Sequence, residues 1–260
     1  MAKFRYQTKS GVKDYLELSK IIQEKLFDTL VKDIKIENGW KVLDIGCGTG
    51  NNSFKLSQMV GEQGKIVAID PIKDRISEAK SSYISPNLSF HEASGKEVTK
   101  FGSDFDLAVA STVVHWIPRE DRKGIFEGIR QTLKEEGSFV FNMTKQNTIN
   151  MMPISEKLNP DGEYLGGNYF PGISTDELIE LGLNSGFTNV QVREERVSIP
   201  LPSVDHYLRW YACSIHTRNY EETLQKVREI CEKEDITSCV YDSEGRVAYE
   251  QTYFFGYFQK

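Results

Sequence analysis

The sequence has few cysteines, no long apolar segment and no apolar core behind its first charged residues. Its cysteines form no Cys-x-x-Cys pair, so neither a structural zinc site nor a disulfide framework is predicted; they are Cys47, Cys213, Cys231 and Cys239. No apolar run approaches the roughly 20 residues that a membrane helix needs. An N-terminal signal peptide would need an apolar stretch after its basic residues. We therefore expect a cytoplasmic protein with no membrane association and no bound metal.

Basic residues are also fewer than acidic ones. The 260 residues include 38 acidic and 32 basic ones, which gives a net charge of -6. Proteins that bind nucleic acids usually present a basic face, and no basic block here is longer than two residues. We expect no nucleic-acid partner. The composition, 39% hydrophobic and 27% charged, is typical of a folded domain, and we predict one domain over residues 1–260.

Strands and helices alternate regularly through the first half of the chain. The spacing of apolar residues predicts a helix over Val12–Ile34. The segments that follow read as five strands (Trp40–Ile45, Lys65–Ile69, Asn87–His91, Asp106–Ala110, Ser138–Met143) and three helices (Asn51–Val60, Lys73–Tyr83, Glu120–Leu133). This alternation favours a parallel sheet with helices on both faces. Residues 38–145 are therefore predicted to form a doubly wound α/β core.

The regular alternation stops after this core. Thr144–Gly172 is rich in proline and glycine, and a loop of this length is often a lid. The rest of the chain predicts a helix, a strand, two helices and a last strand, over Thr175–Ser185, Thr188–Ile199, Ser203–Asp235 and Val247–Phe258. We predict that residues 146–174 and 200–238 cover and select a substrate.

Aromatic residues in these two segments are the candidates for substrate contacts. Tyr207 and Trp210 lie on one face of a predicted helix, together with Tyr211. That face either packs onto the sheet or lines a substrate pocket. Tyr169 is a further candidate within the expected lid.

The most informative segment is a glycine loop between the first strand and the next helix. Gly46, Gly48 and Gly50 alternate there, and glycine is needed where the backbone turns sharply or lies against a ligand. The fingerprint of dinucleotide-binding proteins, G-x-G-x-x-G, would place a glycine at Asn51. An acid, Asp44, also precedes the loop. A dinucleotide site is therefore disfavoured.

A second acid follows at the spacing expected for a nucleoside ligand. Asp70 ends the second predicted strand, 20 residues after Gly50. An acid at this position in a strand–loop–helix–strand unit accepts hydrogen bonds from ribose hydroxyls. Each signal is weak alone, but together and in this order they predict a nucleoside-type cofactor.

The loop V-L-D-I-G-C-G-T-G (residues 42–50) resembles the first motif of the class I S-adenosylmethionine-dependent methyltransferases, and the resemblance covers about Trp40–Met143. It implies a Rossmann-like seven-stranded sheet, an N-terminal helix and a helical cap inserted before the last strand. The implied cofactor is S-adenosylmethionine, and the product is S-adenosylhomocysteine.

The resemblance also implies which residues contact the cofactor. The backbone of Gly46, Cys47, Gly48 and Gly50 would line its methionine and ribose, and Asp70 would hold both ribose hydroxyls. The other implied contacts are Asp44 at the amino group, Tyr6 at the methionine carboxylate, Ser111 near the methyl group, and Pro71, Ile72, Ala93 and Ser94 around the adenine.

The residues after the fourth strand are expected to face the acceptor. Enzymes of this class that methylate amide or nucleobase nitrogens usually carry Asn/Asp-Pro-Pro-aromatic there, which this chain lacks. The pair His115-Trp116 resembles small-molecule carboxylate methyltransferases, such as those of juvenile hormone acid and trans-aconitate. Trp116 would then contact the substrate carboxyl, or else anchor the core or the lid. His115 would contact cofactor or substrate, or pack at a helix entry.

The chemistry favours a carboxylate acceptor. A methyl group on a sulfonium is already activated, because the cofactor carries the hard chemistry. A carboxylate is ionised at pH 7, so the enzyme only aligns and desolvates it. We predict O-methylation of a small-molecule carboxylate by a monomer or homodimer. The alternatives are methylation of a small amine or thiol, with His115 as general base, or a non-catalytic cofactor-binding subunit.

Overall fold

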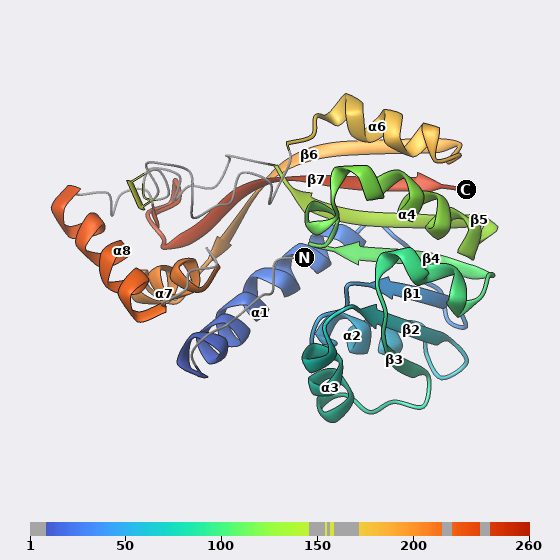
Figure 1. Cartoon of the computed structure of the whole chain (residues 1–260), viewed down its shortest axis with the longest axis horizontal. Coiled ribbons are helices and arrows are strands. Elements are labelled where there is room, and N and C mark those ends of the chain that lie inside the picture. Colours follow the sequence, from blue (N-terminus) through green and yellow to red (C-terminus); the bar gives the residue numbers. More distant parts are fainter. Residues whose placement is uncertain (1–8, 146–153, 155–156, 159–171, 215–219, 235–239) are drawn as a thin grey trace. The chain divides into compact units, whose positions relative to one another are not determined.

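The computed structural model describes residues 9–145, 154, 157–158, 172–214, 220–234 and 240–260. The described chain contains seven strands, seven α-helices and two short 3₁₀ turns, joined in the order shown in Figure 1. The first part runs α1 (Lys9–Val31), β1 (Lys41–Ile45), α2 (Asn51–Met59), β2 (Lys65–Asp70), α3 (Lys73–Ser82), β3 (Leu88–Glu92) and β4 (Phe105–Ser111). The second part runs α4 (Arg119–Thr132), β5 (Leu133–Thr144), α6 (Thr175–Asn184), β6 (Asn189–Pro200), α7 (Val204–Ser214), α8 (Tyr220–Glu234) and β7 (Ala248–Gln259). The two 3₁₀ turns are η1 (Gly95–Phe101), between β3 and β4, and η2 (Val114–Trp116), between β4 and α4.

The strands form one mixed sheet in the order β3-β2-β1-β4-β5-β7-β6. The first five strands are parallel, and β7 runs antiparallel to β5. The chain order reverses at β1, where β2 lies on one side and β4 on the other. Ligands of open α/β sheets bind at such a switch point, beyond the carboxyl ends of the strands. The predicted Rossmann-like α/β fold is confirmed, and α7 and α8 form the helical segment before the last strand.

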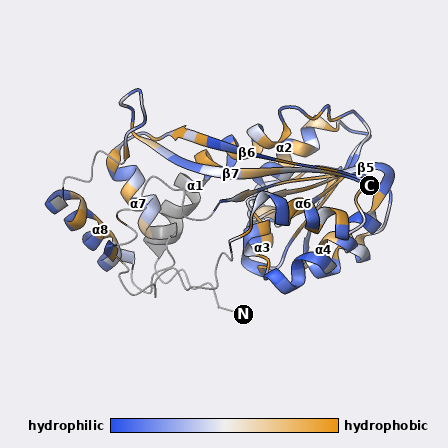
Figure 2. Cartoon of the chain, turned by 90° about the horizontal axis from the view of Figure 1, so that it is seen from above, coloured by the Kyte–Doolittle hydropathy of each residue, from blue (hydrophilic) through white to orange (hydrophobic). Residues whose placement is uncertain are grey.

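Both faces of the parallel strands are buried, because alternate residues point to opposite sides. Leu43 and Ile45 of β1 pack into a cluster that includes Ile125 and Phe126 of α4. Asp44, between them, receives a hydrogen bond from Ser53 of α2. Helices therefore cover each face, as the predicted doubly wound arrangement requires. In Figure 2, α3 and α4 carry hydrophilic and hydrophobic residues on the same helix, as helices on a sheet surface do.

A cluster of five phenylalanines packs on the α4 side of the sheet. Phe139 and Phe141 of β5 contact Phe258 of β7 and Phe126 of α4, with ring centroids 5.1–6.2 Å apart. Phe187 lies 5.4 Å from Phe258. Most of these pairs are edge-on or tilted, the arrangement that the ring quadrupoles favour.

Two local differences from the predictions have clear causes. The fifth strand was predicted over Ser138–Met143, but β5 begins at Leu133, directly after α4, and its pairing with β4 shifts register between Phe105 and Leu107. The extra residues form an irregularity within one long strand instead of a separate turn. The 3₁₀ turn η1 was not predicted either. It is capped by Glu97, whose side chain accepts hydrogen bonds from the N–H and the hydroxyl of Ser94.

The described chain divides into two compact units. One comprises residues 26–144, 173–195 and 253–260, and the other comprises residues 1–25, 145–172 and 196–252. The predicted core, residues 38–145, falls in the first unit except for its last residue. The predicted lid and cap segments fall almost entirely in the second. That all 260 residues act as one domain stays a prediction.

The second unit has its own aromatic core. Tyr207 and Trp210 of α7 are buried, and the Trp210 ring lies 4.8 Å from that of Tyr249 on β7. The indole N–H of Trp210 donates to the hydroxyl of Ser19 on α1, at 3.2 Å. The aromatic face of α7 therefore packs within its own unit.

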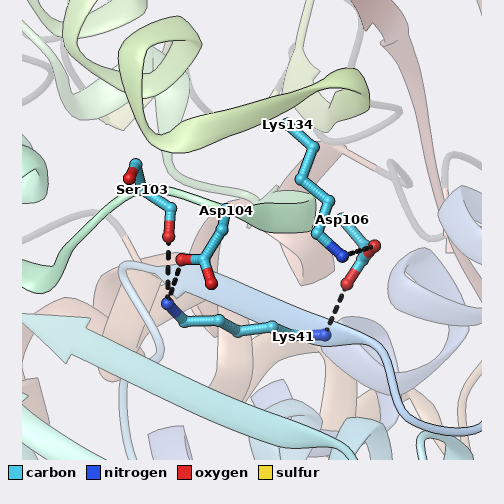
Figure 3. A network of polar contacts seen from close by, with 5 residues as sticks. All are labelled: Lys41, Ser103, Asp104, Asp106 and Lys134. Carbon is cyan, nitrogen blue, oxygen red and sulfur yellow. Dashed lines mark hydrogen bonds and ion pairs between the residues drawn. The ribbon is translucent and has the colours of Figure 1, made fainter.

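The amino ends of β1 and β4 are joined by charged residues (Figure 3). The backbone N–H of Lys41 donates to Asp106 at 2.8 Å, and the Lys41 ammonium contacts Asp104 and the carbonyl of Ser103. Lys134 donates to the other oxygen of Asp106. These contacts fix the end of the sheet opposite the glycine loop, so both ends of β1 are anchored.

Candidate functional site

The glycine loop leaves β1 at the switch point of the sheet. The N–H groups of Gly46 and Cys47 both donate to the carbonyl of Ile69 on β2, at 2.7 and 2.9 Å. Gly46, Gly48 and Gly50 have φ angles of 71°, 56° and 89°, a region that disfavours side chains. The alternating glycines are therefore required by the path of the backbone itself.

The surroundings of the three glycines differ. A Cβ at Gly46 would come within 2.4 Å of Val113, in the loop after β4, and a Cβ at Gly50 within 2.7 Å of the Phe90 ring. A Cβ at Gly48 would meet nothing within 4 Å. Gly46 and Gly50 thus allow neighbouring side chains to pack against the loop, whereas the backbone at Gly48 is open to a ligand.

Asp70 ties this loop to the end of β2. One carboxylate oxygen accepts a hydrogen bond from the N–H of Gly48 at 3.0 Å, and the other accepts from the N–H of Ile72 at 2.9 Å. Asp70 is buried, and the guanidinium of Arg75 lies 3.9 Å away. A carboxylate has about four acceptor sites, so two bonds leave capacity for hydroxyl groups of a ligand.

Asp44 lies beneath the loop and is almost wholly buried. The hydroxyl of Ser53 on α2 donates to it at 2.6 Å. Burial raises the pKa of Asp44 to about 6, the Ser53 bond opposes the rise, and the charge of Asp70 adds to it. The same burial and both carboxylates raise the pKa of the Cys47 thiol. Cys47 is therefore a neutral thiol at pH 7, and its contribution to the loop is its backbone.

Residues expected around an adenine lie next to Asp70. Ala93 is buried, and its N–H donates to the carbonyl of Asp70 at 3.1 Å. Ser94 is engaged with Glu97 in capping η1. Pro71 is exposed and Ile72 is half-buried. The carboxyl ends of β2 and β3 thus bring these four residues together, and their contact with an adenine stays a prediction.

The carboxyl end of β4 is held in an unusual conformation. Thr112 has a φ of 59°, although it is β-branched. Its N–H donates to the side-chain oxygen of Asn142, at 2.7 Å. Asn142 is fully buried at the end of β5 and also donates to the carbonyl of Leu26 and to the hydroxyl of Ser111. Asn142 therefore fixes the β4 loop, a role that the sequence predictions did not include.

His115 and Trp116 form η2, directly after this loop. Their ring centroids are 5.3 Å apart. His115 is buried, whereas 37% of Trp116 is exposed. Burial, with the positive charge of Arg122 as a second cause, lowers the pKa of His115 to about 3. His115 is therefore a neutral imidazole at pH 7, and Trp116 is the member of the pair that solvent reaches.

Arg122 is a second residue that the predictions missed. It belongs to the first turn of α4, yet its side chain is only 1% exposed. Its Nε–H donates to the carbonyl of Ile117 at 3.0 Å, which places the guanidinium next to η2. A basic residue four positions before Phe126, on the apolar face of the helix, is the sequence signal that was available.

The remaining predicted residues belong to the other unit or lie outside the described part of the chain. Tyr207 and Trp210 belong to the core of the other unit, and their contact with a substrate stays a prediction. Tyr6 and Tyr169 lie outside the described residues. Within the described residues, no group of three or more His, Cys, Asp or Glu side chains could hold a metal ion. None of the described helices is both long and apolar enough to span a membrane.

Comparison with known proteins identifies similar sequences. Residues 42–137 match the family model described as a methyltransferase domain. The chain is 29% identical to the demethylmenaquinone methyltransferase of Oceanobacillus iheyensis over 187 residues, 64% of this chain and 76% of that protein. It is 26% identical to the arsenite methyltransferase of Rattus norvegicus over 179 residues, 60% of this chain and 47% of that protein. The chain thus spans less than half the length of the rat relative.

Solved structures share the fold. The mycolic acid cyclopropane synthase CmaA1, in a complex with S-adenosylhomocysteine, superposes with a TM-score of 0.59. The match covers 95% of this chain and 88% of that one, at 16% sequence identity. This level of identity supports the fold alone.

Proposed function

We propose that the protein transfers a methyl group from S-adenosylmethionine to an oxygen of a small-molecule carboxylate. Two observations support this: residues 42–137 match the methyltransferase-domain model, and the glycine loop resembles that of the class I S-adenosylmethionine-dependent methyltransferases. The similar proteins are named for different acceptors, arsenite in one case and demethylmenaquinone in another. The acceptor of this chain must therefore be argued from its own residues.

The cofactor fits the donors and acceptors of the glycine loop. S-adenosylmethionine supplies a methyl group on a sulfonium, which leaves a neutral thioether behind. The open backbone at Gly48 would lie against it, and the free acceptor capacity of Asp70 would receive its ribose hydroxyls. Asp44, ionised above a pKa of about 6, would face its amino group. These residues bind and orient the donor.

The observation that favours a carboxylate acceptor is the environment of His115. A phenol or an ammonium group must lose a proton before it can accept a methyl group, and His115 is the natural base at the end of β4. Burial next to Arg122 lowers the pKa of this imidazole to about 3, so it is a weak base. A carboxylate is already ionised at pH 7 and forms its new C–O bond with no proton to remove. The chain then has to align the acceptor and exclude water.

The test is a transfer assay with S-adenosylmethionine that carries a labelled methyl group. The purified chain is incubated with a panel of carboxylic acids, a panel of primary amines and a panel of thiols, at pH 7.5. We expect label in base-labile methyl esters from the acid panel. Label only in amines or thiols would contradict the carboxylate proposal, and would favour an N- or S-methyltransferase.

A binding measurement separates activity from cofactor recognition. Calorimetric titration with S-adenosylhomocysteine should show one site per chain. Binding without transfer to any panel would indicate a non-catalytic cofactor-binding subunit. Absence of binding would contradict the assignment of Gly48 and Asp70 to the cofactor.

A further inference from the structure

Arg122 carries a positive charge that the described structure leaves without a counter-ion. Both terminal nitrogens of its guanidinium, Nη1 and Nη2, are buried and have no hydrogen-bond partner among the described residues. Only the Nε–H is used, in the bond to the carbonyl of Ile117. Burial lowers the pKa of Arg122, with the charge of Arg119 acting in the same direction. The guanidinium remains protonated even so, because arginine is not deprotonated in proteins.

Such a charge is costly unless an anion meets it. The acid whose charge acts on Arg122 is Glu177, near the start of α6. Its carboxylate is bonded elsewhere, to the guanidinium of Arg119 and to the N–H of Ser174. Among the described residues, therefore, no carboxylate is within ion-pair distance of Arg122. In the part of the chain that the structure describes, the place of an anion beside Arg122 is thus left for a ligand.

The position of Arg122 matches that of an acceptor group. Its guanidinium is held against Ile117, the residue that follows His115-Trp116. Its charge acts on His115, and the neighbouring Trp116 is exposed to solvent. All these residues follow β4 at its carboxyl end, where the glycine loop packs through Val113. The guanidinium and the glycine loop therefore lie at the same end of the sheet.

We propose that the Nη1 and Nη2 groups of Arg122 bind the carboxylate of the methyl acceptor. This inference rests on the proposed function and adds the residue that selects the acceptor. Two parallel N–H donors on a planar guanidinium match the two oxygens of a carboxylate. Each oxygen keeps a further lone pair, so one of them still attacks the methyl group. Methylation removes the negative charge, so the ester is held less strongly than the acid, which favours product release.

The test uses benzoate and benzamide, two probes of similar shape of which only benzoate is charged. Each is titrated into the chain with S-adenosylhomocysteine present, for the wild type, Arg122→Lys and Arg122→Met. We expect benzoate to bind at least 10-fold more weakly to both variants, because lysine retains the charge but lacks the paired donors. Benzamide should bind equally to all three proteins. Unchanged benzoate affinity in Arg122→Met, or no benzoate binding to the wild type, would overturn the proposal.

Two further measurements distinguish this role from a structural one. Arg119→Met removes a neighbouring, exposed arginine from the same helical turn and should leave benzoate binding unchanged. Arg122→Met should melt at or above the temperature of the wild type, since it removes a buried charge that lacks a partner. A large drop in the melting temperature of Arg122→Met, with the Lys variant binding benzoate normally, would assign Arg122 to folding and overturn the proposal.

The outcomes also separate this inference from the proposed function. If benzoate binds through Arg122 but no acid is methylated, anion binding by Arg122 is supported and the proposed carboxylate methylation is contradicted. If acids are methylated with the same KM by the wild type and by Arg122→Met, the proposed function is supported and binding of the acceptor carboxylate by Arg122 is contradicted. Phosphate, titrated in the same way, tests whether the site prefers a carboxylate; tighter binding of phosphate than of benzoate contradicts the proposal.

Discussion

Gly48 differs from its neighbours in what a side chain would meet. An alanine there suffers the strain of a left-handed backbone, about 1–2 kcal/mol, but no clash. Gly39 provides a matched control, because it also has a positive φ, of 87°, and also has nothing within 4 Å of its Cβ position. We expect Gly48→Ala and Gly39→Ala to lose similar stability in urea unfolding.

Only one of these two variants should affect the cofactor. The Cβ of Gly48→Ala would occupy the open approach to the loop, so its affinity for S-adenosylhomocysteine should fall at least 10-fold, or about 1.4 kcal/mol. Gly39→Ala should bind normally. Equal affinity of both variants in calorimetric titration would mean that the ligand does not lie against Gly48.

Asp44 is a buried acid whose charge opposes folding. Its pKa is about 6 in the folded chain against an ordinary 3.8. The folded state therefore binds the proton more tightly, so stability falls as the pH rises from about 4 to 6. A shift of two units corresponds to roughly 3 kcal/mol at pH 7.5. Asp44→Asn should thus be more stable than the wild type at pH 7.5, and this advantage should largely vanish at pH 4.5.

Urea unfolding at both pH values measures this difference, and the exposed Asp33→Asn serves as the control. The asparagine variant should also bind S-adenosylhomocysteine more weakly, because the resemblance places Asp44 at the amino group of the cofactor. A variant that is less stable than the wild type at pH 7.5 would show that the Ser53–Asp44 bond outweighs the cost of burying the charge.

At the scale of elements, a hydrogen bond links the residues at the carboxyl ends of β4 and β5. The bond from Thr112 to Asn142 maintains a φ that costs about 1–3 kcal/mol in a non-glycine residue. Asn142→Ala should destabilise the chain by about 1–3 kcal/mol, since it leaves buried backbone groups without partners. Without the bond the backbone at Thr112 can relax, so Thr112→Gly should stabilise Asn142→Ala less than it stabilises the wild type.

A double-mutant cycle in urea measures this coupling. Asp104→Gly is the control, because Asp104 also has a positive φ, of 77°, but lies before the other end of β4. Its effect should add to that of Asn142→Ala without coupling. Additive effects of Thr112→Gly and Asn142→Ala would show that the asparagine does not hold the loop.

The periodicity of the sequence was sufficient to predict the strands, the main helices and the fold. It also placed Asp44, the glycine loop and Asp70 at one end of the sheet, because motif and strand order agree there. The short turn η1 was missed, although Ser94-x-x-Glu97 is a capping signal. The start of β5 was missed because Lys134–Gly137 is polar and ends in glycine, a pattern typical of a connection between elements.

Arg122 and Asn142 were missed for a different reason. Each is a polar residue within an apolar pattern, Asn142 in Phe139–Met143 and Arg122 on the buried face of α4. One polar residue does not change the helix or strand that an apolar pattern predicts, and its partners become visible only in the folded chain. The substrate roles of Tyr207 and Trp210, and the similarity to juvenile hormone acid and trans-aconitate methyltransferases, stay predictions.

At the scale of the whole molecule, the unit that holds the glycine loop is assembled from three separate stretches of chain. Its last stretch, Tyr253–Lys260, supplies the part of β7 that pairs with β5. Phe258 is fully buried among Phe126, Phe139 and Phe141, so the C-terminal residues complete the core. Every residue assigned to the cofactor precedes this stretch by more than a hundred positions.

The last prediction concerns this dependence of the site on the C-terminus. Phe258→Ala should lower the free energy of unfolding by about 3–5 kcal/mol, as truncation of a buried phenylalanine does. Tyr257→Ala, at a half-buried neighbour on the other face of β7, should cost less. Deletion of residues 253–260 should abolish S-adenosylhomocysteine binding, although the glycine loop, Asp44 and Asp70 are intact, because β5 loses its antiparallel partner and the phenylalanine cluster loses Phe258. A truncated chain that binds S-adenosylhomocysteine with wild-type affinity would show that the parallel strands fold without β7.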